Sequence, residues 1–398
     1  MSLNNLSHIY RGLLQRNRAF ASFKPDELET IFLDIIKSDI TYEDVIFDPM
    51  SGYGGGMTYF GGKGFSTFNI ELNPPSYYWQ ILINPANHEI LIATINLLLN
   101  VKKWPILKET YSITDELFSE PAIDHINNLY KKVISLTNDR NISIAVLLPF
   151  VARFANYQRN DTNFTHFKQG GICSFVSWKN DFIEYLVTLK NKIATQEKND
   201  TRHTNVLCNF TDFDIEKRFK YFVTSPPYPN YRDYSKIFKI ENWVLKNILN
   251  EDLSNLHHMI GSDIVKGKTF GEINSQIVNN FLCKLLEKSK KLSKRSKYDI
   301  EVYYYPYFAL YFYQLQQIIF KLNKLLESKA LGYLVVNNNI TRDIEVPVGK
   351  AICEIFSNMG YEYFIIDESE IFHLGNLRRN AKRINSRHIR QIVKVWKK

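Results

Sequence analysis

The sequence predicts an α/β protein built around a mostly parallel, doubly wound sheet. Short apolar runs typical of buried strands alternate along the chain with segments whose apolar residues recur at helical spacing. The first such strand is followed at once by a glycine-rich turn. A chain of 398 residues with 45% apolar content suffices for one large domain with insertions or for two to three ordinary domains.

The expected elements follow from these patterns in chain order. Residues 1–45 have a helical pattern, in which Pro25 and the acids after it mark the start of a helix. Residues 76–200 are also mostly helical in pattern, although Pro149 argues against an unbroken helix over 144–154. The other expected elements are helices over 90–99 and 306–326 and strands over 45–47, 65–70, 205–207, 221–223, 332–336, 361–366 and 389–396.

The glycine-rich turn carries the first chemical signal. It reads Asp48-Pro49-Met50-Ser51-Gly52-Tyr53-Gly54-Gly55-Gly56. Glycines let a backbone turn sharply and approach a ligand closely. The next expected strand leads into Glu71, about 20 residues later, where an acid can accept hydrogen bonds from ribose hydroxyls. Strand, turn and acid at this spacing indicate cofactor binding, and a plain tight turn is the alternative.

The second signal directly follows the expected strand over 221–223 and reads Ser225-Pro226-Pro227-Tyr228. Two consecutive prolines fix φ and supply no N–H, so the segment is stiff while its carbonyl oxygens can still accept hydrogen bonds. An ordinary loop is the alternative, but such a run is rare by chance at usual proline frequencies.

Asp-Pro-x-x-Gly-x-Gly followed by a later Ser-Pro-Pro-Tyr resembles the amino-methyltransferases of DNA, which modify exocyclic amines with S-adenosylmethionine. The resemblance covers about residues 15–80 and 200–398, including Asp233-Tyr234 and the stretch from Gly332 to Asn338 with Val346-Pro347. It implies a Rossmann-like seven-stranded methyltransferase core with a mostly helical insertion. The implied parts are an N-terminal part of the core over 1–84, an insertion and possible DNA-recognition region over 85–200, and a C-terminal part of the core over 201–398.

The resemblance also implies roles for individual residues. The catalytic loop would consist of Ser225, Pro226, Pro227 and Tyr228. The residues implied to bind S-adenosylmethionine are Phe23, Lys24 and Pro25 near its methionine end, Asp48, Pro49, Ser51, Gly52 and Gly54 in the glycine-rich turn, Glu71 at the ribose, and Asn209 near the adenine. Met50 stands where the family usually has Phe, and a thioether can pack in that place.

An exocyclic base amine is a poor nucleophile, because its lone pair is delocalised into the ring. Ser225 Oγ and the Pro226 carbonyl could accept its two N–H groups and localise that lone pair. Tyr228 would stack on the base once the base has flipped out of the duplex. In the family, Ser at the first loop position goes mostly with cytosine N4, and Asp or Asn goes mostly with adenine N6. The resemblance therefore favours N4-methylcytosine and leaves N6-methyladenine open.

Positive charge is concentrated in two places. The net charge is +9, and residues 371–398 carry nine Lys or Arg and no acid, so the rest of the chain sums to zero. A second basic run lies over 284–297. Such charge favours a polyanion such as double-stranded DNA, and a solvated surface is the alternative. Candidate phosphate contacts are Lys284–Lys297, Arg378, Arg379, Lys382 and Arg383, and the insertion adds Arg153, Tyr157, Arg159, His166, Lys168 and Trp178, which could equally be helix surface and core.

The sequence gives little support to a metal-binding protein or a membrane protein. The four cysteines match no metal spacing and suit a reducing compartment, and His257-His258 and His373 lack ligands at metal spacing. The most apolar stretch, 81–101, is too polar for a membrane span. We therefore expect a cytoplasmic enzyme without metal. The resemblance to the DNA amino-methyltransferases further implies double-stranded DNA as a partner and a cognate restriction endonuclease as a counterpart.

Two other classes stay open. One is an RNA or protein amine methyltransferase. The other is a non-catalytic nucleic-acid-binding module with a degenerate cofactor pocket, although the joint presence of Asp48, Glu71 and the Ser-Pro-Pro-Tyr run argues against decay. Asn337-Asn338-Asn339, at the end of an expected strand, is expected to support the substrate loop.

Overall fold

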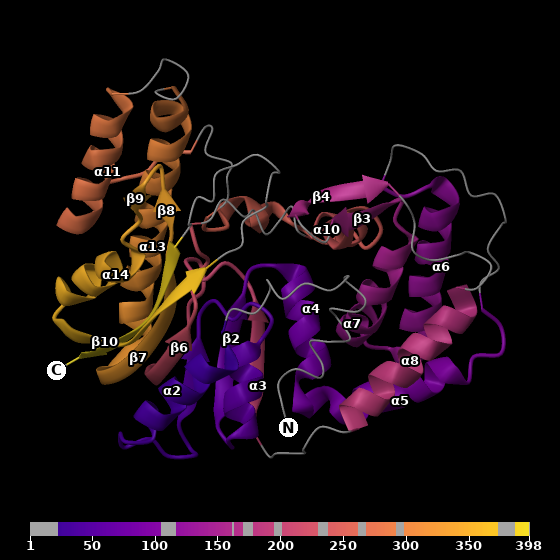
Figure 1. The fold of residues 1–398 in the computed structure, drawn as a ribbon. Coiled ribbons are helices and arrows are strands. Elements are labelled where there is room, and N and C mark those ends of the chain that lie inside the picture. Colours follow the sequence, from indigo (N-terminus) through magenta and orange to yellow (C-terminus); the bar gives the residue numbers. More distant parts are fainter. Residues whose placement is uncertain are drawn as a thin grey trace. The chain divides into compact units, whose positions relative to one another are not determined.

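In a computed structural model of the chain, the described residues are 23–104, 117–160, 163–169, 178–194, 201–229, 238–261, 268–291, 298–372 and 387–397. They fall into two compact units (Figure 1). The first unit holds the described residues of 52–207 and 234–256, and the second holds those of 23–51, 208–233 and 257–398. Each unit is described by itself.

Seven strands form one sheet in the order β10-β11-β7-β6-β1-β2-β5. The strands are β1 Val45–Asp48, β2 Ser66–Glu71, β5 His203–Leu207, β6 Phe219–Thr224, β7 Leu326–Asn338, β10 Tyr361–Phe372 and β11 Arg387–Lys397. β6 pairs in parallel with β1 and β7, β2 pairs in parallel with β5, and β11 runs antiparallel to β7 and β10. The expected Rossmann-like, seven-stranded α/β core is confirmed, with each expected strand present.

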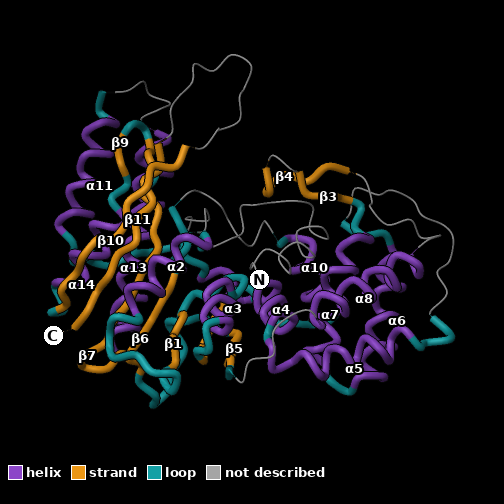
Figure 2. Tube along the Cα trace, turned by 60° about the horizontal axis from the view of Figure 1, so that its bottom comes forward, coloured by secondary structure: helices purple, strands orange, loops and turns teal. Residues whose placement is uncertain are grey.

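In the second unit, helices cover both faces of the sheet. β10, β11, β7 and β6 run alongside one another (Figure 2). Tyr333 donates from its hydroxyl to Asp34 of α2 (2.8 Å), whereas Asn338 accepts from the Gly349 N–H of α14 (3.0 Å). Because odd and even residues of a strand point to opposite faces, α2 and α14 lie on opposite sides of β7. Besides the strands of the sheet, this unit contains α2 Pro25–Ile35, α11 Gln276–Ser289, a π-helical turn Asp299–Tyr304, α13 Tyr305–Leu325, α14 Val348–Ser357, and the hairpin of β8 Ile340–Thr341 and β9 Ile344–Glu345. The turn Ser254–His258 spans the unit boundary.

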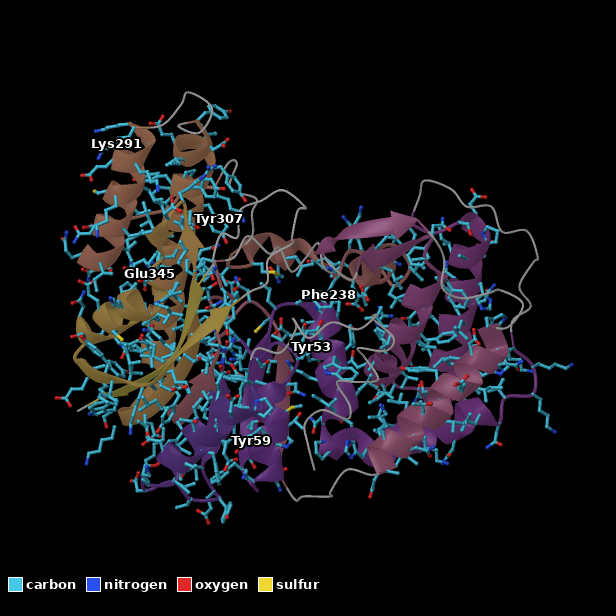
Figure 3. All side chains as sticks on the ribbon, viewed as in Figure 1. Tyr53, Tyr59, Phe238, Lys291, Tyr307 and Glu345 are labelled. Carbon is cyan, nitrogen blue, oxygen red and sulfur yellow. The ribbon has the colours of Figure 1, made fainter. Side chains whose placement is uncertain are left out.

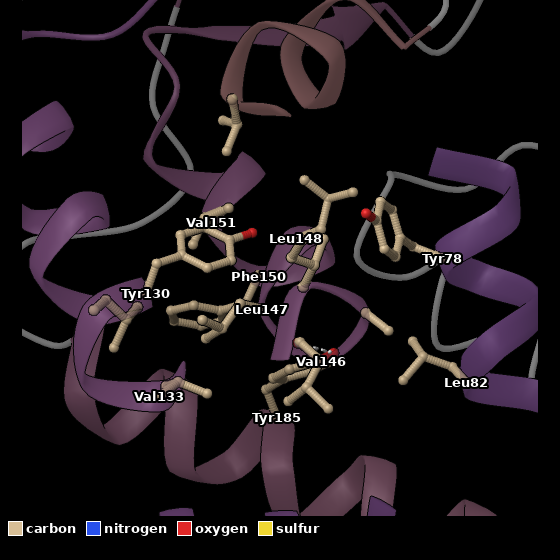
Figure 4. Packing of buried hydrophobic residues seen from close by; sticks show 14 of the residues in the cluster. Tyr78, Leu82, Tyr130, Val133, Val146, Leu147, Leu148, Phe150, Val151 and Tyr185 are labelled. Atoms are coloured by element: carbon tan, nitrogen blue, oxygen red, sulfur yellow. Dashed lines mark hydrogen bonds between the residues drawn. The ribbon is translucent and has the colours of Figure 1, made fainter. Parts of the chain in front are cut away.

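The first unit is mostly helical, and the predicted insertion over 85–200 lies within its range. Its helices and hairpin are α3 Gly55–Gly62, α4 Pro74–Ile83, a 3₁₀ turn Pro85–Asn87, α5 His88–Leu99, α6 Glu120–Thr137, α7 Arg140–Val151, a 3₁₀ turn Ala152–Phe154, β3 Tyr157–Asn160, β4 Asn163–Gln169, α8 Trp178–Ala194 and α10 Lys239–Asn247. Buried side chains of α4, α6, α7 and α8 form its core (Figure 4). The buried Tyr185 hydroxyl donates to the Val146 carbonyl of α7 (2.8 Å), so this polar group is satisfied inside the core.

Some local expectations need correction. The helix expected over 144–154 is instead Arg140–Val151, and Asp139 caps its start by accepting from the Ile142 N–H (2.9 Å). Pro149 lies two residues before the helix ends, so it removes one hydrogen bond without breaking the helix. The hairpin β3–β4 lies in a stretch expected to be mostly helical. Of the helical pattern over 1–45, Pro25–Ile35 is a helix, 36–44 are not, and 1–22 lie outside the described residues.

Among the described helices, none is by itself long and apolar enough to cross a membrane. Within the described ranges, one pair of helices, Pro74–Ile83 and Pro85–Leu99, meets that length and composition when taken together, and the pair is bent by 70° at its junction.

Candidate active site

The Ser-Pro-Pro-Tyr loop leaves the carboxyl end of β6, where the sequence places it. β6 lies between β1 and β7 and is parallel to both, so the loop stands at the edge where these strands end. Ser225 and Pro226 are buried, and Pro227 and Tyr228 are half-buried. The loop is therefore part of the packed edge of the second unit.

Two carbonyl groups of the loop are held by side chains of the same unit. The Tyr311 hydroxyl of α13 donates to the Pro227 carbonyl (3.0 Å), and the Asn339 amide donates to the Pro229 carbonyl (2.9 Å). The expected support by the asparagine run is thus confirmed for Asn339. The Pro226 carbonyl receives no hydrogen bond from any described residue, so its lone pairs are open to a donor from outside this set.

Ser225 has a defined donor and acceptor direction. Its Oγ lies 3.1 Å from the Val335 carbonyl of β7 and 2.8 Å from the Tyr228 hydroxyl. A carbonyl can only accept, so the single Ser225 proton is donated to Val335. Tyr228 must then be the donor to Ser225 Oγ. One lone pair of Ser225 Oγ is left to accept from a further group.

A buried ion pair lies behind Tyr228. The Arg390 guanidinium of β11 stands over the Tyr228 ring, with its central carbon 5.5 Å from the ring centroid, and its charge opposes the rise in the pKa of Tyr228 that burial causes. Arg390 also binds Glu27 of α2 through Nε and Nη2, with Nη2 2.7 Å from Oε2. The exposed fractions of Arg390 and Glu27 are 7% and 5%. Glu27 in turn accepts from the Lys24 backbone N–H (2.7 Å), at the start of the segment expected to meet the cofactor.

Sequence reasoning missed Glu27 and Arg390 as part of this site. They are 363 positions apart, and no local spacing connects them. Arg390 counted only as one of the basic residues of the C-terminal stretch. The strand pairing of β11 with β7, which sets Arg390 opposite Asn337, is what brings it to the loop.

Asp48 ends β1 as a buried carboxyl, 3% exposed. Its Oδ1 accepts from the Met50 N–H (3.1 Å). Burial raises the pKa of Asp48 to about 7, against the lowering effects of the nearby Thr224 hydroxyl and of the Met50 N–H. Thr224 nevertheless makes no hydrogen bond of normal geometry with Oδ2, which has no partner among the described residues.

Three buried polar atoms without a partner in the described chain end three neighbouring strands. They are Asp48 Oδ2 at the end of β1, Thr224 Oγ1 at the end of β6 and Asn337 Oδ1 near the end of β7. The strand order reverses between β1 and β6, because the chain continues from β1 to β2 on one side and from β6 to β7 on the other. Ligands of open α/β sheets bind at this point, beyond the carboxyl ends of the strands. Buried polar atoms left unpaired there are suited to a polar ligand.

The other residues expected at the cofactor in this unit have different surroundings. Phe23, Pro49 and Ser51 are buried, Lys24 is half-buried and Pro25 is exposed. The Asn209 side chain is engaged in its own turn: its amide donates to Asp212 (3.0 Å) and its carbonyl accepts from the Thr211 N–H (3.4 Å). These hydrogen bonds use one amide proton and one carbonyl lone pair of Asn209, and its contact with an adenine stays a prediction.

In the first unit, the glycine-rich turn has the expected geometry. Gly52 and Gly54 have φ of 53° and 75°, a left-handed conformation that favours glycine, and Gly54 directly precedes α3. The Gly52 carbonyl accepts from Gln80 Nε2 (2.6 Å). Glu71 ends β2 half-buried, and its Oε1 accepts from the Asn73 N–H (2.7 Å). The local strand, turn and acid are as expected, and their contact with a cofactor stays a prediction.

One of the candidate phosphate contacts is engaged within the protein, because Lys288 pairs with Asp343 (2.9 Å). Lys394 and Arg390, which belong to the basic C-terminal stretch, pair with Asp34 (2.6 Å) and Glu27. Trp178 is a core residue, 6% exposed, as the simpler alternative had it. By contrast Lys284, Lys290 and Lys291 are exposed, and Lys291 lies just beyond the end of α11 (Figure 3).

Other candidates lie where side chains or backbone are not described. Arg153 lies in the turn Ala152–Phe154, His257 and His258 lie in the turn Ser254–His258, and Tyr157, Arg159, His166 and Lys168 lie on the hairpin β3–β4. Asp233, Tyr234, His373 and the basic residues Arg378, Arg379, Lys382 and Arg383 fall outside the described residues. Within the described ranges, no group of three or more His, Cys, Asp or Glu could hold a metal ion.

Comparison with known proteins gives only a distant likeness. No protein-family model and no curated protein matches the chain. Two solved structures of the rRNA methyltransferase aviRa from Streptomyces viridochromogenes align with TM-scores of 0.31 and 0.32 at 7% sequence identity, covering 99% of this chain and 94% of theirs. An alignment this loose carries no conclusion about the site of this chain.

Proposed function

We propose that this protein is an S-adenosylmethionine-dependent methyltransferase that methylates an exocyclic amine of a base in double-stranded DNA, with cytosine N4 as the target. The observation that carries the proposal is the Ser225-Pro226-Pro227-Tyr228 loop at the strand-end edge, with a serine lone pair and a proline carbonyl open to donors. The choice of cytosine rests on the resemblance in the loop sequence.

The residues at the end of β1 fit a cationic cofactor. A buried carboxyl with an elevated pKa and an unpartnered oxygen is unfavourable when charged, unless a cation lies beside it. S-adenosylmethionine carries a sulfonium and an ammonium group, and when bound it supplies an activated methyl group. In its charged form, the Asp48 carboxylate would pair with such a cation. The Lys24 segment, whose backbone is hydrogen-bonded to Glu27, would lie nearby in the second unit.

The loop residues fit a base amine. Ser225 Oγ and the Pro226 carbonyl would each accept one N–H, which draws electron density back to the amine nitrogen and makes it a better nucleophile. The Tyr311 and Asn339 hydrogen bonds hold the neighbouring carbonyls in place, so the acceptors need little reorganisation. A flipped base would stack on the half-buried Tyr228 ring, which the Arg390 guanidinium helps to hold.

The remaining parts of the proposal concern the cell. A DNA methyltransferase of this kind would act in the cytoplasm of a prokaryote, with double-stranded DNA as its substrate and a restriction endonuclease as its counterpart. The exposed lysines at the end of α11 support a polyanionic substrate.

The first experiment identifies the methylated atom. The protein is incubated with methyl-labelled S-adenosylmethionine and unmethylated genomic DNA, and the digested nucleosides are separated by mass spectrometry. We expect label in N4-methylcytosine. Label in N6-methyladenine would keep the enzyme and overturn the target, and cofactor binding without label in DNA would redirect the search to RNA, protein or a non-catalytic role.

Two variants separate chemistry from cofactor binding. Ser225→Ala should lower kcat about 100-fold or more and leave the calorimetric affinity for S-adenosylmethionine unchanged, because it removes one acceptor from the amine. Glu71→Ala should chiefly weaken cofactor affinity. Equal loss of affinity and turnover in Ser225→Ala would show that the role given to Ser225 is wrong.

A further inference from the structure

We infer that Glu27 and Arg390 are positioning residues, which orient the acceptor lone pair of Ser225 through the Tyr228 hydroxyl. This inference rests on the proposed function. It assigns no contact with substrate to either residue: they act on the reaction only through the catalytic loop.

The hydrogen bonds of this group run in one direction. The Arg390 guanidinium lies over the Tyr228 ring, and this cation–π contact holds the ring and therefore the position of its hydroxyl. Tyr228 donates its proton to Ser225 Oγ (2.8 Å), and Ser225 donates to the Val335 carbonyl (3.1 Å). Each step fixes the next, and the remaining Ser225 lone pair points away from both Tyr228 and Val335.

The ion pair keeps Arg390 in place. Glu27 binds two nitrogens of the guanidinium, a fork geometry that a single lysine nitrogen would not reproduce. Both side chains are more than nine-tenths buried. Burial also raises the pKa of Tyr228 above its ordinary value, so the hydroxyl stays protonated and able to donate.

The same helix and strand provide a matched comparison. Seven residues after Glu27 on α2, Asp34 binds Lys394, which lies four residues after Arg390 on β11. Lys394 pairs with Tyr333 across the strands and Arg390 pairs with Asn337, so both ion pairs join the same face of the sheet to α2. The Asp34–Lys394 pair anchors the helix as the Glu27–Arg390 pair does, but it contacts Tyr333 instead of the catalytic loop.

A double-mutant cycle on methyl transfer to DNA tests the inference. Tyr228→Phe keeps the ring and removes the donor, and Glu27→Gln/Arg390→Gln removes the ion pair without leaving one buried charge alone. We expect each to lower kcat roughly 10- to 100-fold with KM for S-adenosylmethionine changed less than about threefold. Because the groups act in series, the combined variant should be no slower than the slower of the two.

The control is Asp34→Asn/Lys394→Gln, which removes the less buried ion pair between the same helix and strand and should leave kcat unchanged. If the losses of kcat multiply in the combined variant, or if the control loses as much kcat as the Glu27–Arg390 variant, the inference is wrong. The proposed function would still stand in either case. A wild-type protein that binds the cofactor but transfers no methyl group to a base amine would overturn both.

Discussion

Asp48 is a single buried residue whose ionisation affects the stability of the folded protein. Its pKa is raised to about 7 in the folded protein, from an ordinary 3.8. The folded state therefore holds the proton more tightly than the unfolded state. The free energy of unfolding falls as the pH rises from about 4 to about 7, and it is level on either side of that window.

Asp48→Asn removes this dependence. The variant should be more stable than the wild type, and the difference should grow by about 3 kcal/mol between pH 5 and pH 8, since one pKa unit corresponds to about 1.4 kcal/mol. Denaturant unfolding of the cofactor-free protein at the two pH values measures it. The same variant should bind S-adenosylmethionine more weakly, because a neutral amide cannot pair with a cation. A stability difference that is equal at both pH values would contradict the role of burial.

Single residues also mark the limit of prediction from the sequence. The loop residues Ser225–Tyr228 and the turn from Asp48 to Gly54 are contiguous, so their spacing was enough to find them. Glu27 and Arg390 become partners only through the pairing of β11 with β7, which no local pattern states. Asn209 was assigned by its position after a strand. Its amide donates to Asp212, and its contact with an adenine stays a prediction.

At the scale of elements, the contact between β6 and β7 depends on Gly332, because glycine has no side chain. A Cβ added at Gly332 would lie 1.8 Å from a ring carbon of Phe222, which is fully buried and stacks on Phe356. The ring has no room to withdraw, because it packs between the sheet and α14. Gly332 is therefore a packing requirement of the sheet.

Gly332→Ala should destabilise the protein by several kcal/mol, as expected when a buried ring must leave its packed position. Gly62→Ala is the matched control, because an added Cβ there meets nothing within 4 Å, and alanine in a helix gains about 0.5–1 kcal/mol. Thermal unfolding of both variants measures the contrast. Equal unfolding temperatures would show that β6 and β7 adjust to the methyl group.

The sequence predicted the helices and strands that are marked by a regular apolar spacing, and it failed for elements that such a spacing does not mark. The seven strands of the sheet and the long helix α13 contain apolar residues in a consistent pattern, and the sequence predicted each of them. The hairpin β3–β4 is polar and aromatic, so it lacks the alternation that marks a half-buried strand. Pro149 misled the prediction of α7 because a proline near the end of a helix costs only one hydrogen bond.

At the scale of the whole molecule, net charge overstates the positive surface. Three of the basic residues of the two runs, Arg390, Lys394 and Lys288, are neutralised by acids distant in sequence. Lys288 also donates to the Arg342 carbonyl in the hairpin that follows β7. The last turn of α11 thus lies at the carboxyl edge of the second unit's strands, the same edge as the Ser225–Tyr228 loop. Lys290 and Lys291 follow it as exposed residues.

If DNA lies along this edge, Lys290 and Lys291 contact its phosphates. Lys290→Gln/Lys291→Gln should reduce the slope of log affinity against log salt by about 0.9 for each lost contact, weaken binding equally for all sequences, and leave cofactor affinity unchanged. Lys324→Gln/Lys329→Gln removes the same charge near the start of β7, at the opposite edge, and should leave the slope unchanged. Fluorescence anisotropy over a salt series measures both variants. Equal slopes for the two would show that the positive charge acts by its total amount, and that the substrate does not lie along the carboxyl edge.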